Sequence, residues 1–398
     1  CLGGSEMCIR DSYYIGNNQR KLKKKGVGDY PLIIANVGVS GDYGSFEKEL
    51  SKAKLAIKAG ASIINDNSLI GNIFENYRKF LIELPVPFAT VGINCLAKKI
   101  ISNDEMIENE FVGNIIQQIE MGVDVITLHA TIFKDDLDVM NSTSRIISCT
   151  SRGGLMLLKY MSENNIQNPF WTHFDDILLC AKKYNATISL CTSFRPASIY
   201  DCSLHNELYW IEILRIGRLV EKAKMVDVNI MIEGIGHCPI NLIPNIIYET
   251  KKICYDAPYR ILAVSTDIAL GYDHISSAIA TAVAIENGAD IVTCVTRAEH
   301  IGLPSKKEIY ESIISTKIAV HSGYIARTND YSRDFNMAKA RMKNGCIGEI
   351  DAAIDPLLAK ISISKHKYYN GKKQCEMCGA NCSLDILENI SNKKQMKT

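Results

Sequence analysis

The sequence predicts an α/β protein built on a (β/α)8 TIM-like barrel with C-terminal helices. One unit recurs three times: an amphipathic helix, a glycine and a short apolar strand that ends in polar residues. Its copies are FEKELSKAKLAIKAGASIIND, MIENEFVGNIIQQIEMGVDVITLHA and SSAIATAVAIENGADIVTCVT. In the first copy apolar residues share one helical face, and Gly60 supplies the C-terminal cap. Because helices alternate with strands over about 300 residues, a closed parallel barrel is favoured over a doubly wound sheet.

The strands of this barrel are predicted from nine apolar runs, one more than a (β/α)8 barrel requires. Three of the runs belong to the repeated unit, and the other six are rich in β-branched residues. Those six are PLIIANVGVS, VPFATVGIN, SRIISCTSRGG, ATISLCTSFRP, VNIMIEGIGH and RILAVSTDIA. Segments with helical spacing separate most of them, so each strand is expected to lead into a helix that covers the barrel.

The chain is expected to have four parts. Residues 1–30 form an N-terminal arm, and we interpret residues 1–12 as translated sequencing adaptor or cloning sequence. Residues 31–304 form the candidate catalytic barrel, and residues 305–365 form C-terminal helices. Residues 366–398 read as a flexible, lysine-rich linker and a mobile tail with three cysteines.

The charge balance favours a small ligand. The chain has 45 basic and 44 acidic residues, so neither a nucleic acid nor a membrane surface is expected as a partner. No apolar run approaches the roughly 20 residues that cross a bilayer, and no signal peptide is visible. A cytoplasmic protein is therefore expected. Most of the cysteines stand singly in apolar runs, as Cys191 and Cys294 do, which is typical of small buried side chains.

Polar side chains follow almost every predicted strand. Active sites of such barrels lie where strands end and the loops to the next helices begin, so these side chains are expected to line one pocket. They are Asn36, Asn65, Asp66, Asn94, His129, Ser151, Arg152, Arg195, Glu233, His237, Asp267, Glu299 and His300.

Two of these residues form a candidate metal site. His237 in EGIGHCP and His300 in TRAEHIGLP each follow a strand. Two imidazoles at the ends of neighbouring strands can share a metal ion and leave positions open for substrate or water. A helix-capping or core role remains open for either histidine.

Two further turns suit an anion. In SRGG a hydroxyl, the Arg152 guanidinium and glycine-exposed N–H groups can all donate to phosphate or carboxylate oxygens. Arg195 in SFRPAS is a second candidate anion clamp.

The tail contains CEMCGANC, with Cys375, Cys378 and Cys382. A [4Fe–4S] cluster held by three thiolates keeps one iron free to bind something else. Zinc is the alternative, with His366 as a possible fourth ligand. The triplet favours the cluster, and both readings stay open.

These motifs together resemble the phosphomethylpyrimidine synthase family of thiamine biosynthesis (ThiC, short form) and its relative 5-hydroxybenzimidazole synthase. The resemblance covers about residues 30–382. It rests on ANVGVS, TLHA, SRGG, FRPASI, MIEGIGHCP, TDIALGYDHISSAI, EHIGLP and the final CxxCxxxC.

The resemblance implies a homodimeric radical S-adenosylmethionine enzyme with a [4Fe–4S] cluster on its C-terminal tail and an external electron donor. The implied substrate is 5-aminoimidazole ribotide, and the implied product is the hydroxymethylpyrimidine phosphate, with formate and carbon monoxide as by-products. His237 and His300 would hold Zn2+ or Fe2+, and Cys375, Cys378 and Cys382 the cluster. Glu233 would be catalytic and would contact substrate together with Asn36, His129, Ser151, Arg152, Gly153 and Arg195.

Several substrate positions differ from the family pattern. Asn65 replaces a Met, Asn94 and Arg260 each replace a Tyr, and an acidic turn reads Thr192-Ser193-Phe194 before Arg195. The metal and cluster ligands are intact. A paralogue that acts on another ribotide or makes a different product, such as 5-hydroxybenzimidazole, is therefore the alternative. A non-catalytic metal-binding barrel is a third reading.

Overall fold

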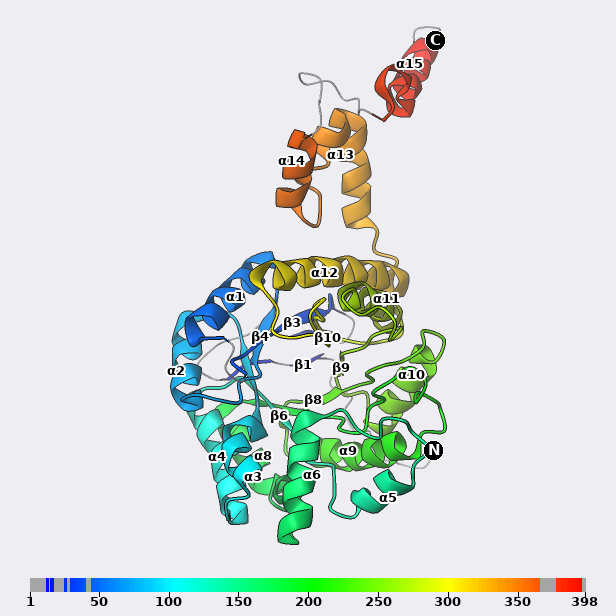
Figure 1. Cartoon of the computed structure of the whole chain (residues 1–398). Helices are drawn as coiled ribbons and strands as arrows, with labels where there is room; N and C mark the ends of the chain where they lie inside the picture. The colour runs from blue at the N-terminus through cyan, green and yellow to red at the C-terminus, as the bar shows by residue number, and fades with distance from the viewer. Residues whose placement is uncertain are drawn as a thin grey trace. The chain divides into compact units, whose positions relative to one another are not determined.

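The computed structural model describes residues 12–13, 15–17, 25–26, 29–40, 44–365 and 377–395 (Figure 1). The chain divides into two compact units, residues 1–327 and 328–398. The first unit is a closed barrel of parallel strands in the order β10-β3-β4-β5-β6-β7-β8-β9. The strands are β3 (Leu32–Val37), β4 (Ile63–Asp66), β5 (Phe88–Val91), β6 (Val125–Leu128), β7 (Thr187–Leu190), β8 (Ile230–Glu233), β9 (Tyr259–Ile261) and β10 (Ile291–Thr293). The predicted barrel is confirmed.

Helices surround the strands, as Figure 1 shows for α1, α2, α4 and α9 to α12. They are α1 (Phe46–Ala59), α2 (Ile73–Glu83), α3 (Ala97–Ser102), α4 (Glu108–Met121), α5 (Asp136–Ser142), α6 (Arg152–Asn164), α7 (Pro169–Thr172), α8 (Phe174–Tyr184), α9 (Glu207–Met225), α10 (Ile243–Ile253), α11 (Asp273–Glu286) and α12 (Lys306–Thr328). The first ends at Gly60, as its sequence predicts. The Ser45 side chain caps the Lys48 N–H, and Gly60 is left-handed at φ 119°.

The ninth apolar run, SRIISCT, is not a strand. It forms an irregular loop before α6, because Asp201 accepts the backbone N–H groups of Ile146 and Ile147 at 2.8 and 3.0 Å. Ile146 is β-branched, as many strand residues are, but it is 74% exposed and is not buried in a sheet. Ser151 and Arg152 accordingly begin a helix and do not end a strand.

The inside of the barrel changes from apolar to polar along the strands. At the amino-terminal end, a cluster of Ile34, Ile63, Ala89, Val125, Met231 and Ile291 fills the interior together with Ile15. Two residues further along their strands, the inward-facing side chains are Asn65, Thr127 and Thr293. The apolar layer therefore supports a polar floor, and the cavity lies above it.

The second unit contains α13 (Ser332–Gly348), α14 (Pro356–Lys365) and, after residues that are not described, α15 (Ser383–Gln395). The four-part division of the chain stays a prediction. Among the described residues, no helix is long and apolar enough to cross a membrane.

Candidate active site

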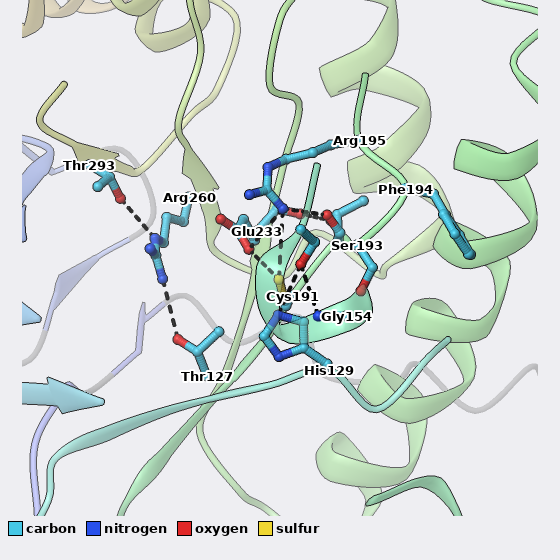
Figure 2. Close-up of polar contacts among 12 residues, drawn as sticks. Thr127, His129, Gly154, Cys191, Ser193, Phe194, Arg195, Glu233, Arg260 and Thr293 are labelled. Atoms are coloured by element: carbon cyan, nitrogen blue, oxygen red, sulfur yellow. Dashed lines mark hydrogen bonds and ion pairs between the residues drawn. The ribbon is translucent and has the colours of Figure 1, made fainter. Parts of the chain in front are cut away.

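A cavity of about 400 Å3 lies at the carboxyl ends of the strands. Its walls come from every part of the barrel, and they include the predicted strand-end residues except Asp66 and Asp267. They are Asn36, Asn65, Asn67, Val91, Asn94, Thr127, His129, Thr150, Ser151, Arg152, Gly153, Cys191, Arg195, Glu233, Gly236, His237, Arg260, Leu262, Val264, Val295, Glu299 and His300. Figure 2 shows the central group, in which Arg195, Glu233 and Cys191 face His129.

The SRGG turn forms the amino terminus of α6 against the cavity. Ser151 caps the helix by accepting the Gly154 N–H at 3.3 Å, and its hydroxyl lies 3.1 Å from His129 Nε2. A Cβ on Gly153 would lie 2.4 Å from the His129 ring, and one on Gly154 would lie 2.7 Å from Ser193 Oγ. The two glycines therefore allow the helix end to reach the cavity wall. Backbone N–H groups at such an end attract anions, and Arg152 adds a positive charge beside them.

Arg195 and Glu233 share one wall of the cavity. Arg195 Nη1 lies 3.9 Å from Glu233 Oε2 and donates to the Thr192 carbonyl at 2.7 Å. The Cys191 thiol donates to the same Glu233 oxygen at 2.7 Å. Burial alone would raise the pKa of Glu233, but the charges of Arg195 and Arg260 bring it below its ordinary value. Glu233 is therefore an ionised carboxylate, and burial keeps Cys191 a neutral thiol by raising its pKa.

His129 is a neutral base in this wall. Burial lowers its pKa to about 4, although the Glu233 charge opposes the shift. Its Nδ1 has no hydrogen-bond partner in the described part of the chain. The ring can therefore accept a hydrogen bond from a ligand without first losing a proton.

His237 and His300 lie side by side at the rim, with ring centroids 5.3 Å apart. Each ring is held by a carboxylate: His237 Nδ1 lies 2.6 Å from Asp267 Oδ1, and His300 Nδ1 lies 2.8 Å from Asp273 Oδ1. The carboxylates fix the tautomer and leave both Nε2 atoms available, which is the usual arrangement of histidines that bind metals.

The two imidazoles therefore fit a half-open metal centre. Among the described residues, no group of three or more His, Cys, Asp or Glu side chains is placed to hold a metal ion. A metal bound by two imidazoles keeps the remaining positions for water or substrate. The turn before His237 packs closely against the backbone at Pro196. It requires a glycine, because a Cβ on Gly236 would lie 2.7 Å from the Pro196 carbonyl.

Three of the predicted contacts lie behind the cavity wall. Thr192, Ser193 and Phe194 are buried and are not among the residues that line the cavity. Phe194 packs in the core, and its backbone N–H and that of Ser193 donate to the Glu212 carboxylate at 2.6 and 2.8 Å. The turn thus positions Arg195, and its own side chains face away from the ligand space.

Unlike Thr192, Ser193 and Phe194, the predicted contacts Asn65 and Asn94 do line the cavity. Asn65 Nδ2 donates to Asn36 Oδ1 at 3.0 Å and to Asn67 Oδ1 at 3.1 Å, so the three form one polar strip of the wall. Asn94 is buried, and its Nδ2 has no partner among the described residues.

Two positions at the site were not predicted from the sequence. Asp273 lies in the first turn of α11, and only the fold brings it to His300. Cys191 was assigned to the core; it is buried, yet it lines the cavity beside Glu233. Its place directly after the strand that ends at Leu190 was the available signal.

The structure describes only part of the cysteine tail. Cys375 and His366 lie outside the described residues. Cys378 is half-buried and Cys382 is buried, joined by a 3-10 turn over Gly379–Asn381. The short turn suits closely spaced ligands, and the iron–sulfur tail stays a prediction.

A polar cavity of this kind, at the carboxyl ends of parallel barrel strands, defines a barrel enzyme. The model of the Radical SAM ThiC family matches residues 12–389. This chain belongs to that family.

Curated relatives agree with this assignment. The phosphomethylpyrimidine synthase of Thermoanaerobacter pseudethanolicus is 37% identical over 380 residues, which are 93% of this chain and 87% of the relative. The enzyme of that name from Pyrococcus abyssi is 34% identical over 383 residues, 93% of this chain and 87% of the relative. Dihydropteroate synthase from Coxiella burnetii aligns with 80% of this chain and all of its own, at a TM-score of 0.46 and 12% identity. The resemblance seen in the sequence is confirmed, and the family implies an iron–sulfur cluster and S-adenosylmethionine.

Proposed function

We propose that this protein is a radical S-adenosylmethionine carbon–carbon lyase that acts as a phosphomethylpyrimidine synthase. It converts 5-aminoimidazole ribotide to 4-amino-5-hydroxymethyl-2-methylpyrimidine phosphate for thiamine biosynthesis. The observation that carries the proposal is the cavity, in which an anion site, an ionised carboxylate and two carboxylate-held imidazoles face one space. The family match and the names of the relatives support the reaction.

The amino terminus of α6 is the site we assign to the ribotide phosphate. Ser151, Arg152 and the Gly153 N–H offer a hydroxyl, a guanidinium and backbone amides from one turn. Phosphate bound there receives charge-assisted hydrogen bonds. The ribose and imidazole would then extend toward Glu233 and Arg195, and His129 would accept a hydrogen bond from the ligand.

Cys375, Cys378 and Cys382 are the residues that would hold a [4Fe–4S] cluster. With S-adenosylmethionine and an external electron donor, such a cluster would supply the radical chemistry of the reaction. The protein's own task is to orient the ribotide and keep water from it. Glu233, ionised and held by Arg195, can accept a proton from the ligand in this space.

His237 and His300 are the proposed ligands of Zn2+ or Fe2+. A metal ion held by these two residues would supply Lewis-acid chemistry to the substrate. A homodimeric state and a cytoplasmic location are part of the same proposal.

A second candidate is a paralogue that acts on another ribotide or makes a different product, such as 5-hydroxybenzimidazole. One observation favours it: the floor of the cavity carries a buried arginine, Arg260, in addition to the two arginines of the walls. Aminoimidazole ribotide has a single anionic group, its phosphate.

The test is anaerobic reconstitution with iron and sulfide, followed by reaction with S-adenosylmethionine, a strong reductant and aminoimidazole ribotide. Formation of the pyrimidine phosphate, detected by mass spectrometry, supports the first candidate. Formation of 5′-deoxyadenosine with a different ribotide product supports the second. A zinc-loaded, colourless protein that cleaves no cofactor contradicts both.

A further inference from the structure

The floor of the cavity contains a buried arginine without a carboxylate partner. Arg260 is the inward residue of β9 and is 5% exposed. Within the described residues, no carboxylate oxygen lies within the 4.0 Å of an ion pair with it. Glu233, which faces it, lies 3.9 Å from Arg195 instead. A buried guanidinium that lacks an anion is costly, so its retention on a cavity floor indicates a ligand that supplies one.

The side chain is held in place by neutral groups. Arg260 Nε donates to Thr293 Oγ1 at 2.8 Å, and Nη1 lies 3.4 Å from Thr127 Oγ1 (Figure 2). Thr293 is on β10 beside β9, whereas Thr127 is on β6, three strands away around the barrel. The guanidinium therefore crosses the barrel interior. Two hydroxyl contacts use two of its five N–H groups, and they orient the charge without neutralising it.

The arginines that line the cavity differ in whether a carboxylate lies within ion-pair distance of them. Arg195 lies within ion-pair distance of Glu233, whereas within the described part of the chain Arg152 donates only to the Asn67 carbonyl, at 3.4 Å. The other lining carboxylate, Glu299, forms no ion pair with Arg152 or Arg260 among the described residues. Two guanidinium groups thus remain for ligand anions, one at the amino terminus of α6 and one on the floor.

We propose that Arg260 forms a second anion subsite, which binds a carboxylate on the cavity floor while the α6 amino terminus binds the ribotide phosphate. A carboxylate matches the planar fork of a guanidinium in two parallel hydrogen bonds. The inference rests on the proposed function, because it assumes a ribotide in the cavity. The carboxylate belongs either to the base of the substrate or to formate released beside it.

The experiment is calorimetric titration of the intact protein with aminoimidazole ribotide and with its 4-carboxylate derivative, each with and without formate. Direct binding of formate alone is followed by 13C NMR. Wild type is compared with Arg260→Met, which removes the charge, with Arg260→Lys, which keeps it, and with Arg218→Met. Arg218 is exposed on α9 and does not line the cavity, so it is the matched control.

If the substrate carries the carboxylate, wild type binds the 4-carboxylate ribotide at least about tenfold more tightly than the unsubstituted one. Arg260→Met abolishes this preference, Arg260→Lys retains part of it, and Arg218→Met leaves it intact. If the carboxylate is formate, formate binds wild type but not Arg260→Met, and it tightens aminoimidazole ribotide binding instead of competing with it.

The subsite is overturned if Arg260→Met changes neither the preference between ribotides nor the binding of formate. A failure of both ribotides to bind wild type contradicts the proposed function instead, and the formate arm still reports on Arg260. The melting temperature of each variant is measured to check that the variant is folded. Arg260→Met should melt at about the temperature of wild type, because the Arg260 side chain contacts only neutral hydroxyl groups and, among the described residues, no carboxylate lies within ion-pair distance of it; a large drop would mean that Arg260 is structural.

Discussion

Glu233 shows how single residues acquire their chemistry from their neighbours. Its carboxylate faces Arg195 at 3.9 Å and accepts from the Cys191 thiol at 2.7 Å. The sequence could place it at the end of a strand, because Glu233 follows an apolar run and precedes a glycine turn. It could not provide Cys191 or Arg195 as partners, since both follow the neighbouring strand β7 and reach Glu233 only when the barrel closes.

The first prediction concerns His129. Its pKa is lowered to about 4 by burial, so protonation favours the unfolded chain, whose histidine has the ordinary pKa. The contribution is therefore present at neutral pH and is lost as the pH falls from about 6.5 toward 4. Between pH 7 and pH 5 this costs about 2 kcal/mol. His129→Gln should remove that part of the pH dependence, as measured by urea unfolding at both values.

The comparison for this titration is His173→Gln, at a half-buried histidine whose pKa is raised mainly by a hydrogen bond to Asp176. It should leave the fall from pH 7 to pH 5 at least as steep as in wild type. A His129→Gln variant with an unchanged fall would show that His129 titrates normally.

The second prediction concerns the carboxylates behind the histidine pair. Asp267→Asn and Asp273→Asn should each weaken Zn2+ or Fe2+ binding by about 10- to 100-fold, because the held ring loses its orienting partner. Competition with a chelator measures the affinity. Asp138→Asn on α5, which lies outside the cavity, is the control. Equal affinity in all four proteins would mean that the histidines hold no metal.

At the scale of elements, the helix ends were easier to predict than the loop before α6. The capping residues Ser45 and Gly60 act within a few positions of sequence, so local patterns identify them. The loop over residues 143–150 misled the strand prediction, because Ile146 and Ile147 are exposed and a distant carboxylate, Asp201, accepts hydrogen bonds from their backbone N–H groups. Polar contacts between residues far apart in the sequence leave no periodic pattern from which they could be predicted.

The third prediction tests the close approach of α6. Gly153→Ala would place a methyl group against His129, which should lower the free energy of unfolding by about 1–3 kcal/mol and weaken ribotide binding. Gly113→Ala on α4 meets no atom within 4 Å and should raise the free energy of unfolding by about 0.5–1 kcal/mol. Urea unfolding measures both. A Gly153→Ala variant as stable as Gly113→Ala would contradict the packing of the SRGG turn.

At the scale of the whole molecule, the alternation of helices and apolar strands was sufficient to predict a (β/α)8 barrel. Active-site position followed from the same pattern, since carboxyl ends of parallel strands share one edge. The pattern could not show which strand-end residues point inward. The family resemblance predicted Thr192, Ser193 and Phe194 as substrate contacts, yet they are buried behind the cavity wall.

The central claim is that three tail cysteines hold the cluster with which a barrel enzyme cleaves S-adenosylmethionine. Formation of 5′-deoxyadenosine by the anaerobically reconstituted full chain tests it most directly, with Cys378→Ala and Cys180→Ala compared against wild type. Cys180 is partly buried on α8 and does not line the cavity. We expect wild type and Cys180→Ala to form 5′-deoxyadenosine and Cys378→Ala to form none, at an unchanged melting temperature. Equal formation by Cys378→Ala would contradict the claim.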